Sequence, residues 1–152
     1  MALVNIFDRE GADHFIDRIN KMTSQTSNQW GIMTPAQVLA HCNVAYEMAY
    51  TDKHPRPNAF VRFMLKMFVK GGVVNETPYK KNNRTAPQFV VKGDKDFDIE
   101  KLRLIDFINK TQELGASYWE GKESHSFGNL TAVEWNNSWS KHLDHHLTQF
   151  GA

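Results

Sequence analysis

Apolar side chains recur at intervals of three and four residues along most of this chain of 152 residues. That spacing places them on one face of an α-helix, so the pattern predicts helices rather than strands. Two of the predicted helices open with a Thr followed three residues later by Gln or Glu, at Thr34–Gln37 and Thr131–Glu134, which is the signature of a capping box. The five predicted helices cover approximately residues 8–22, 34–51, 58–70, 96–114 and 131–150.

The segment between the third and fourth predicted helices, residues 73–96, has no regular pattern, and we expect an extended crossover there. Its one strand-like run, residues 88–92, cannot form a sheet by itself. The predicted fold class is therefore all-α, with four long amphipathic helices in a bundle and one shorter helix in a long crossover. The 41% hydrophobic and 23% charged residues fit a single globular domain over residues 1–152.

Charge and cysteine content narrow the class of protein further. A formal net charge of +1 argues against nucleic-acid binding, which usually needs a strong basic excess. The longest apolar stretch, residues 60–74, is interrupted by Arg62, Lys66 and Lys70, so we expect no membrane-spanning helix and no membrane partner. The N-terminal residues lack the basic segment and apolar run of a signal peptide. Because a single cysteine, Cys42, also fits a reducing compartment, we predict a cytoplasmic protein.

Three of the seven histidines lie in the C-terminal segment KHLDHHLTQFG, residues 141–151. Advancing 100° per residue around the last predicted helix places His142 and His146 beside its apolar stripe and His145 at the rim of that stripe. His142 and His146 are four residues apart, so their rings lie one turn apart and can share one ligand. This pair is therefore the candidate for metal binding.

His41 is the comparable residue of the second predicted helix, because it lies among the apolar residues Val38, Cys42 and Ala45. A buried polar group without a partner costs about 1–3 kcal/mol, so three inward imidazoles need a common partner. A divalent metal ion would satisfy them, and three histidine ligands with one open position are typical of a catalytic site. Imidazole suits zinc, nickel, iron and copper. In the alternative interpretation, His142 and His146 hydrogen-bond water or carboxylates at the rim of the bundle.

Other conspicuous side chains have structural interpretations. We interpret the four tryptophans mainly as core anchors, Cys42 as a small core residue, and His14 and His54 as surface residues. The third predicted helix is rich in Phe and Met, and three roles are open for it. It covers the mouth of a pocket, forms the contact surface of a homodimer, or packs against its own chain. The side chains concerned are Phe60, Met64, Met67 and Phe68.

The segments WGIMTPAQVLAHC, residues 30–42, and HLDHHLTQFG, residues 142–151, together with His125, resemble the DinB/YfiT-like superfamily of metalloenzymes. Within it, the chain is most similar to a bacterial branch known only as a domain of unknown function. The resemblance covers essentially the whole chain. It implies a four-helix bundle in an up-down-down-up arrangement, with the crossover between the second and third bundle helices. It also implies a metal site of His41, His142 and His146, followed by Gln149.

The sequence and the resemblance lead to two functional hypotheses. The first is a metal-dependent enzyme that holds zinc or nickel, with iron or manganese as alternatives, and acts on a small molecule. Members of the superfamily use low-molecular-weight thiols, which implies transferase or hydrolase/isomerase chemistry. From their positions in this chain, we take His125 and Glu47 as candidates for general acid or base. His125 lies just before the last predicted helix and Glu47 six residues after His41, and in the alternative interpretation His125 is an exposed loop residue. The second is a non-catalytic small-ligand-binding or stress-related protein in which the metal is structural or absent.

Overall fold

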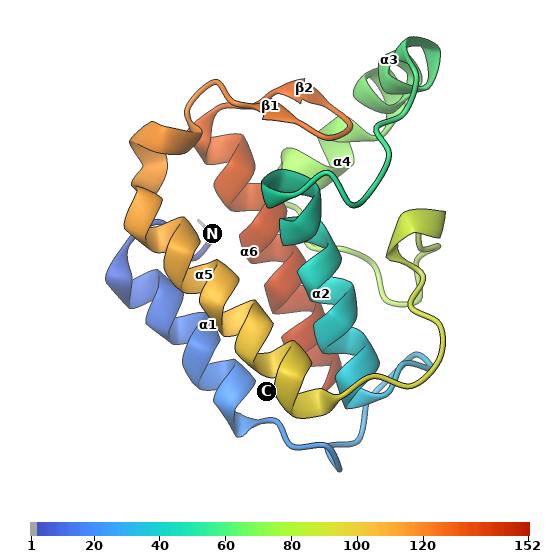
Figure 1. The fold of residues 1–152 in the computed structure, drawn as a ribbon, viewed down its shortest axis with the longest axis vertical. Helices are drawn as coiled ribbons and strands as arrows, with labels where there is room; N and C mark the ends of the chain where they lie inside the picture. The colour runs from blue at the N-terminus through green and yellow to red at the C-terminus, as the bar shows by residue number, and fades with distance from the viewer. Residues whose placement is uncertain (1–2) are drawn as a thin grey trace.

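The computed structural model describes residues 3–152, which are mostly helical (Figure 1). Helices α5 and α6 each contact all the other long helices, and α1 lies diagonally across from α2. The prediction of a mostly α-helical fold is confirmed. Among residues 3–152, no helix is both long and apolar enough to cross a membrane. The four long helices are α1 (Arg9–Lys21), α2 (Pro35–Tyr50), α5 (Phe97–Trp119) and α6 (Ala132–Gln149).

Both predicted capping boxes are present, and they fix where α2 and α6 begin. The Thr34 hydroxyl accepts from the Gln37 backbone N–H at 3.2 Å, while the Gln37 side chain accepts from the Thr34 N–H at 3.0 Å. Thr131 and Glu134 make the same reciprocal pair. Each box satisfies two backbone donors that a helix N-terminus otherwise leaves unpaired. The start of each histidine-bearing helix is therefore set by local sequence.

The core lies between the four long helices and is rich in aromatic rings. Trp119, Trp135 and Trp139 contact each other with ring centroids 4.8–4.9 Å apart, and Tyr46 stacks on Trp139 at 5.2 Å. These three tryptophans are buried, as is Cys42, which confirms their assignment to the core. Rings of this size bury a large apolar area in one contiguous cluster. The long helices are thereby held in fixed positions relative to one another.

The third predicted helix ends close to its predicted end, but the two glycines after it do not stop helical structure in the crossover. Helix α3 (Ala59–Phe68) is followed at once by α4 (Lys70–Val74), which runs through both Gly71 and Gly72. Helix α4 is held against α6, where the Lys141 ammonium donates to the Gly72 carbonyl at 2.7 Å. This tertiary contact overrides the low helix propensity of glycine. Further along, the strand-like run is instead a 3₁₀ turn, η1 (Pro87–Phe89).

The helix predicted to end near Leu114 is interrupted at Gly115, as expected, and a second helical segment of α5 follows it. The chain bends at Gly115, whose φ of 72° is left-handed, and then continues in helical form to the buried Trp119. A short antiparallel hairpin follows, with β1 (Glu123–Ser124) paired to β2 (Gly128–Asn129). The sequence pattern did not predict this hairpin, since strands of two residues are too short for an alternating pattern to be visible.

Candidate metal centre

Three imidazoles converge between α2 and α6, and they are the three histidines that the sequence predicted. One ring nitrogen from each of His41, His142 and His146 lies within 4.8 Å of the other two. The ring centroids of His142 and His146 are 4.7 Å apart, as the spacing of one helical turn requires. The ring of His41 lies 4.9 Å from His142 and 4.4 Å from His146. The prediction that these residues come together is therefore confirmed.

The crossover orients the imidazole of His41. Its Nδ1 lies 2.8 Å from the backbone carbonyl oxygen of Phe89, in the turn η1. A carbonyl oxygen can only accept a hydrogen bond, so Nδ1 carries the proton and Nε2 of the neutral ring keeps its lone pair. The ring of Phe89 also lies 5.4 Å from His41 and 5.7 Å from His142. The sequence did not single out Phe89, because a backbone acceptor leaves no signal in a residue pattern.

A second acceptor fixes the tautomer of His146. Its Nδ1 lies 2.9 Å from the side-chain oxygen of Gln149, and the Gln149 amide nitrogen donates to the Trp30 carbonyl at 2.8 Å. Because that carbonyl only accepts, the amide must point its nitrogen at Trp30 and its oxygen at His146. His146 Nδ1 therefore carries the proton, and its Nε2 is the free nitrogen. Gln149 had entered the prediction only through the family resemblance.

The nitrogens inside this group need a positive charge or a shared proton between them. The Nε2 atoms of His41 and His142 are 3.0 Å apart, a distance at which two lone pairs repel each other. Without a metal ion, the His142 Nε2–H donates to the His41 Nε2, so one proton joins the two rings. A divalent ion could take the place of that proton and draw on all three lone pairs.

Burial keeps all three rings uncharged, and the neutral form is the one that binds metal. It lowers the pKa of His41, and it lowers the pKa of His142 well below the ordinary value of 6.5. Burial, together with the nearby His41, lowers the pKa of His146 to about 3. Within residues 3–152, no carboxylate joins this group. Three neutral imidazoles, two of them oriented by acceptors on their second nitrogen, fit a divalent transition-metal ion.

His145 lies outside this group, as its rim position predicted. Its half-buried ring lies between two aromatic side chains, with centroid distances of 5.7 Å to Trp30 and 5.8 Å to Tyr79. The ring also contacts that of His146 at 4.9 Å. His145 therefore borders the metal centre without contributing a nitrogen to it.

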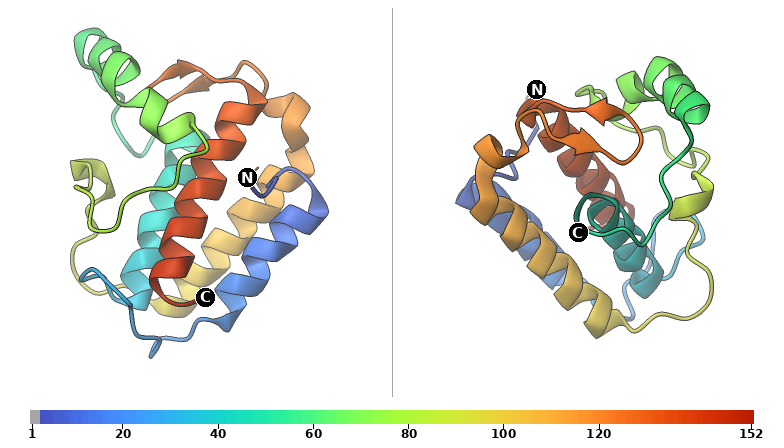
Figure 2. Two further views of the ribbon diagram at one scale, coloured as in Figure 1. Left: turned by 180° about the vertical axis from the view of Figure 1, so that it is seen from behind. Right: turned by 45° about the horizontal axis from the view of Figure 1, so that its top comes forward.

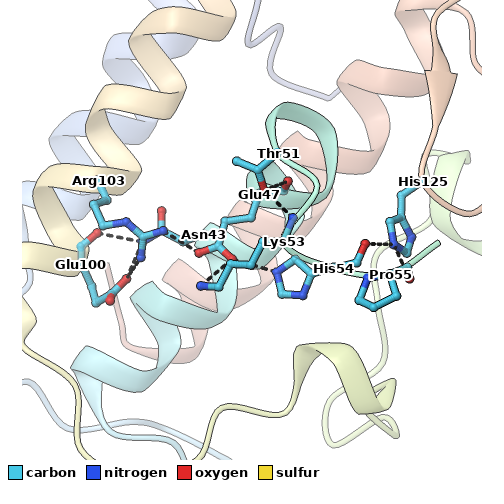
Figure 3. Close-up of polar contacts among 9 residues, drawn as sticks. All are labelled: Asn43, Glu47, Thr51, Lys53, His54, Pro55, Glu100, Arg103 and His125. Carbon is cyan, nitrogen blue, oxygen red and sulfur yellow. Dashed lines mark hydrogen bonds and ion pairs between the residues drawn. The ribbon is translucent and has the colours of Figure 1, made fainter.

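Glu47 belongs to a different cluster of polar residues, which Figure 3 shows. Its buried carboxylate pairs with Arg103 of α5, accepts from His54 Nε2 at 2.7 Å and lies 3.1 Å from the Lys53 ammonium. Burial acts to raise the pKa of Glu47, but the three donors outweigh it and hold the pKa below its ordinary value of 4.5. The prediction that His54 lies on the surface is wrong, because only 16% of its side chain is exposed.

His125 also hydrogen-bonds outside the three-histidine group (Figure 3). Its Nε2 donates to the backbone carbonyls of His54 and Pro55, at 3.1 and 3.0 Å, and its Nδ1 lies 2.7 Å from the Ser126 hydroxyl. This buried ring therefore ties the hairpin to the start of the crossover. Neither His125 nor Glu47 contacts a metal-ligand histidine through these bonds, and their assignment as general acid or base stays a prediction.

Fold and site together define a mostly helical protein with a buried three-histidine group that could hold a metal ion. The chain belongs to the protein family described as "Protein of unknown function (DUF1569)", whose sequence model matches residues 6–152. That range includes all three histidines, Phe89 and Gln149. No curated protein and no solved structure matches the chain.

Proposed function

We propose that the protein is a divalent-metal-dependent enzyme of the DinB/YfiT type. In this proposal α1, α2, α5 and α6 form an up-down-down-up four-helix bundle, and the long connection between α2 and α5 is its crossover. The observation that carries the proposal is the convergence of His41, His142 and His146 as neutral bases. Two of these rings have their second nitrogen bonded to a defined acceptor, an arrangement typical of metal-ligating histidines.

The protein's own residues would hold and orient the ion. His41, His142 and His146 supply three nitrogens, which leaves a position open for a substrate atom. An ion bound there supplies Lewis-acid chemistry and favours the deprotonated form of a water or thiol near neutral pH. The Phe89 ring, which lies against His41 and His142, limits the access of water on its side of the centre. Zinc or nickel fits the donor set, with iron or manganese as alternatives.

We further propose a small-molecule substrate, with a low-molecular-weight thiol as cosubstrate in a transferase or hydrolase/isomerase reaction. This part rests on the resemblance of residues 30–42 and 142–151 to the superfamily. His125 and Glu47 are the proposed proton-transfer groups. Because neither contributes to the three-histidine group, His125→Ala should reduce turnover while the ion stays bound. Loss of the ion together with turnover would instead assign His125 to the stability of the site.

Metal analysis of protein purified without a nickel column tests the proposal. We expect about one divalent ion per chain in the wild type and none in His142→Ala, because two imidazoles hold an ion much less tightly than three. His14→Ala is the matched control, since His14 is exposed on α1 and the variant should keep its ion. A wild-type protein that binds no added zinc or nickel, with His142→Ala behaving identically, would rule out the metal centre.

The contact between His41 and the crossover favours a second candidate function, in which the metal is structural. Because Phe89 supplies the acceptor for His41, an ion bound to His41 would also order η1 and the chain around it. The protein would then be a non-catalytic small-ligand-binding or stress-related module. Melting with and without chelator, paired with thiol-transfer assays on several electrophiles, separates the two. Stability lost on chelation, with no turnover on any electrophile, would favour the structural role.

A further inference from the structure

Helix α3 has an apolar face that no other part of the described chain covers. None of its ten residues is buried. Advancing 100° per residue, the exposed Phe and Met side chains fall within an arc of about 140° on one side of the helix, and the exposed Val61 lies at its edge. Monomeric soluble proteins rarely expose an apolar patch of more than a few hundred Å². The residues of this α3 face, with their exposed fractions, are Phe60 (72%), Phe63 (58%), Met64 (38%), Met67 (61%) and Phe68 (74%).

The opposite side of α3 is held against the protein by basic residues. Arg62 pairs with Glu123 of β1, and the ammonium of Lys66 lies over Gly128 of β2. Just beyond the helix, Lys70 pairs with Glu134 of α6 at 3.0 Å. Figures 1 and 2 show α3 beside the hairpin, projecting beyond the long helices. The cations therefore face inward, and the α3 face is turned to solvent.

We infer that the α3 face binds the same face of a second copy of this chain. A helix that binds an anionic membrane surface needs cations along its apolar face to meet the headgroups, but Arg62 and Lys70 are paired with carboxylates of the same chain. Lys66 is exposed and has no carboxylate partner within residues 3–152, but its ammonium lies over Gly128, on the side of the hairpin and away from the α3 face. The α3 face itself is uncharged and apolar, so an uncharged apolar partner fits it. A second α3 face has that chemistry, and a two-fold axis brings the two together as one self-complementary contact. This inference does not depend on the proposed metal chemistry.

The area of the α3 face is sufficient for a weak dimer. A buried aromatic side chain contributes about 150–250 Å², so the exposed fractions of the three phenylalanines provide about 400 Å² per copy. The two methionines add to this, and two copies together bury about 1,000 Å², the lower limit for a specific interface. An interface of this size is typical of weak or transient association, so the dimer should form reversibly.

Analytical ultracentrifugation over a wide range of protein concentration tests this inference. We expect the wild type to pass from monomer to dimer, and the double variant Phe63→Glu/Phe68→Glu to associate about 30-fold more weakly or worse, because central aromatic side chains dominate interface energies. The matched control is Leu102→Glu, which also places a charge at an exposed apolar residue, on α5, and should dimerise like the wild type. Because α3 buries no side chain, circular dichroism should show all three proteins equally folded.

Three outcomes would overturn the inference. The first is a wild type that stays monomeric at every concentration. The second is a Leu102→Glu variant that loses association as completely as the double variant, since the contact would then not be confined to α3. The third is a monomeric wild type that floats with phosphatidylglycerol vesicles while the double variant does not, which would assign the α3 face to a membrane surface.

Discussion

His41 and Glu47, both buried polar side chains of helix α2, have opposite surroundings. His41 faces two more imidazoles of α6, while Glu47, six residues later, faces Arg103, Lys53 and His54. Both side chains are almost fully buried. The first cluster consists of uncharged bases with one proton shared between two rings, and its lone pairs converge on one place. The second consists of an acid whose charge is matched by cations of the same chain.

Burial of a polar side chain does not by itself mark a binding site, because the two clusters differ in whether the chain supplies their partners. The carboxylate of Glu47 has its hydrogen-bond partners within the chain, and its network continues through Arg103 to Glu100 and from there to Asn43 (Figure 3). The charge of the Glu47 carboxylate is thus matched within the chain, and the cluster holds α2 to α5, although the buried side-chain oxygen of Asn43 at its far end has no partner among the described residues. The three histidines instead have lone pairs that converge on one place, and only one proton of the chain lies between them. An added ion should therefore act on the histidines and leave the cluster of Glu47 unchanged.

The largest expected effect is stabilisation by metal. At a free zinc concentration about 1,000 times the dissociation constant, binding to the folded state adds about 4 kcal/mol to the free energy of unfolding. The variant His146→Ala should lose this gain, and Glu47→Gln should keep it. Denaturant titrations of metal-free protein, with and without zinc, measure the difference. An equal gain in His146→Ala would place the ion elsewhere and remove the distinction between the two clusters.

The next effect comes from the second cluster. Glu47→Ala should lower the free energy of unfolding by about 2–3 kcal/mol, because it leaves Arg103 and His54 without their shared partner. This is less than the ~3–5 kcal/mol typical of a fully buried ion pair, since Arg103 and Lys53 are 37% and 63% exposed and can regain water. Urea unfolding of the wild type and Glu47→Ala measures this difference in the free energy of unfolding. The same loss in the presence and absence of zinc shows that the clusters are independent, whereas a reduced metal affinity would couple them.

As the pH is lowered, the two clusters should lose their contributions to the free energy of unfolding in different pH ranges. In the metal-free protein, the His146 ring has a folded pKa of about 3 against an ordinary value of 6.5, so its contribution is complete above pH 6.5 and is lost as the pH falls toward 3. At pH 5 the loss from this ring is about 2 kcal/mol. Glu47, with its pKa held below 4.5, contributes above that pH and loses its contribution only in stronger acid.

Unfolding at a series of pH values with chelator present tests this separation. Between pH 6.5 and 5, His146→Ala should lose about 2 kcal/mol less than the wild type, while Glu47→Gln should follow the wild-type curve. The control outside both clusters is His14→Ala, which should also follow it. If Glu47→Gln changes the pH dependence of the free energy of unfolding above pH 5, the carboxylate titrates together with the histidines. That result would contradict the independence of the two clusters.

Local patterns account for what the sequence predicted of the fold. The starts of α2 and α6 depend on capping boxes four residues long, and these are correct. What the chain does at and after the glycines depends on contacts far away in the sequence. Gly71 and Gly72 stay helical because α4 packs on α6, and α5 continues past Gly115 because Trp119 reaches the aromatic core. Gly115 therefore marked a real interruption of the helix, whereas the prediction that Gly71 and Gly72 stop helical structure was wrong.

In the candidate site, too, features set by neighbouring residues in the sequence were predictable, and contacts with distant residues were not. Helical spacing placed His142 and His146 one turn apart, and the apolar neighbours of His41 placed it inward. The acceptor for His41 is a backbone carbonyl of Phe89, 48 residues away, and nothing in the side-chain pattern marks it. The environment of Glu47 likewise depends on Arg103, which lies 56 residues later on α5. The sequence therefore predicted the three-histidine group better than the residues that orient its rings.

The smallest expected effect tests one of these orienting residues. Gln149→Ala removes the acceptor for His146 Nδ1 and should weaken zinc binding about tenfold, as loss of an outer-shell partner typically does. Gln25→Ala, an exposed glutamine in the loop before α2, is the matched control. Isothermal titration with zinc measures both affinities.

Gly31 provides an independent way to disturb the same contact without touching either residue. Its φ is +81°, and a Cβ added there would lie 2.4 Å from the amide nitrogen of Gln149. Gly31→Ala should therefore displace Gln149 from the Trp30 carbonyl and reproduce the loss of zinc affinity. The double variant Gly31→Ala/Gln149→Ala should bind zinc no more weakly than Gln149→Ala, because the two substitutions break one contact. Additive losses would mean that Gly31 acts on the metal centre by a route other than the orientation of His146.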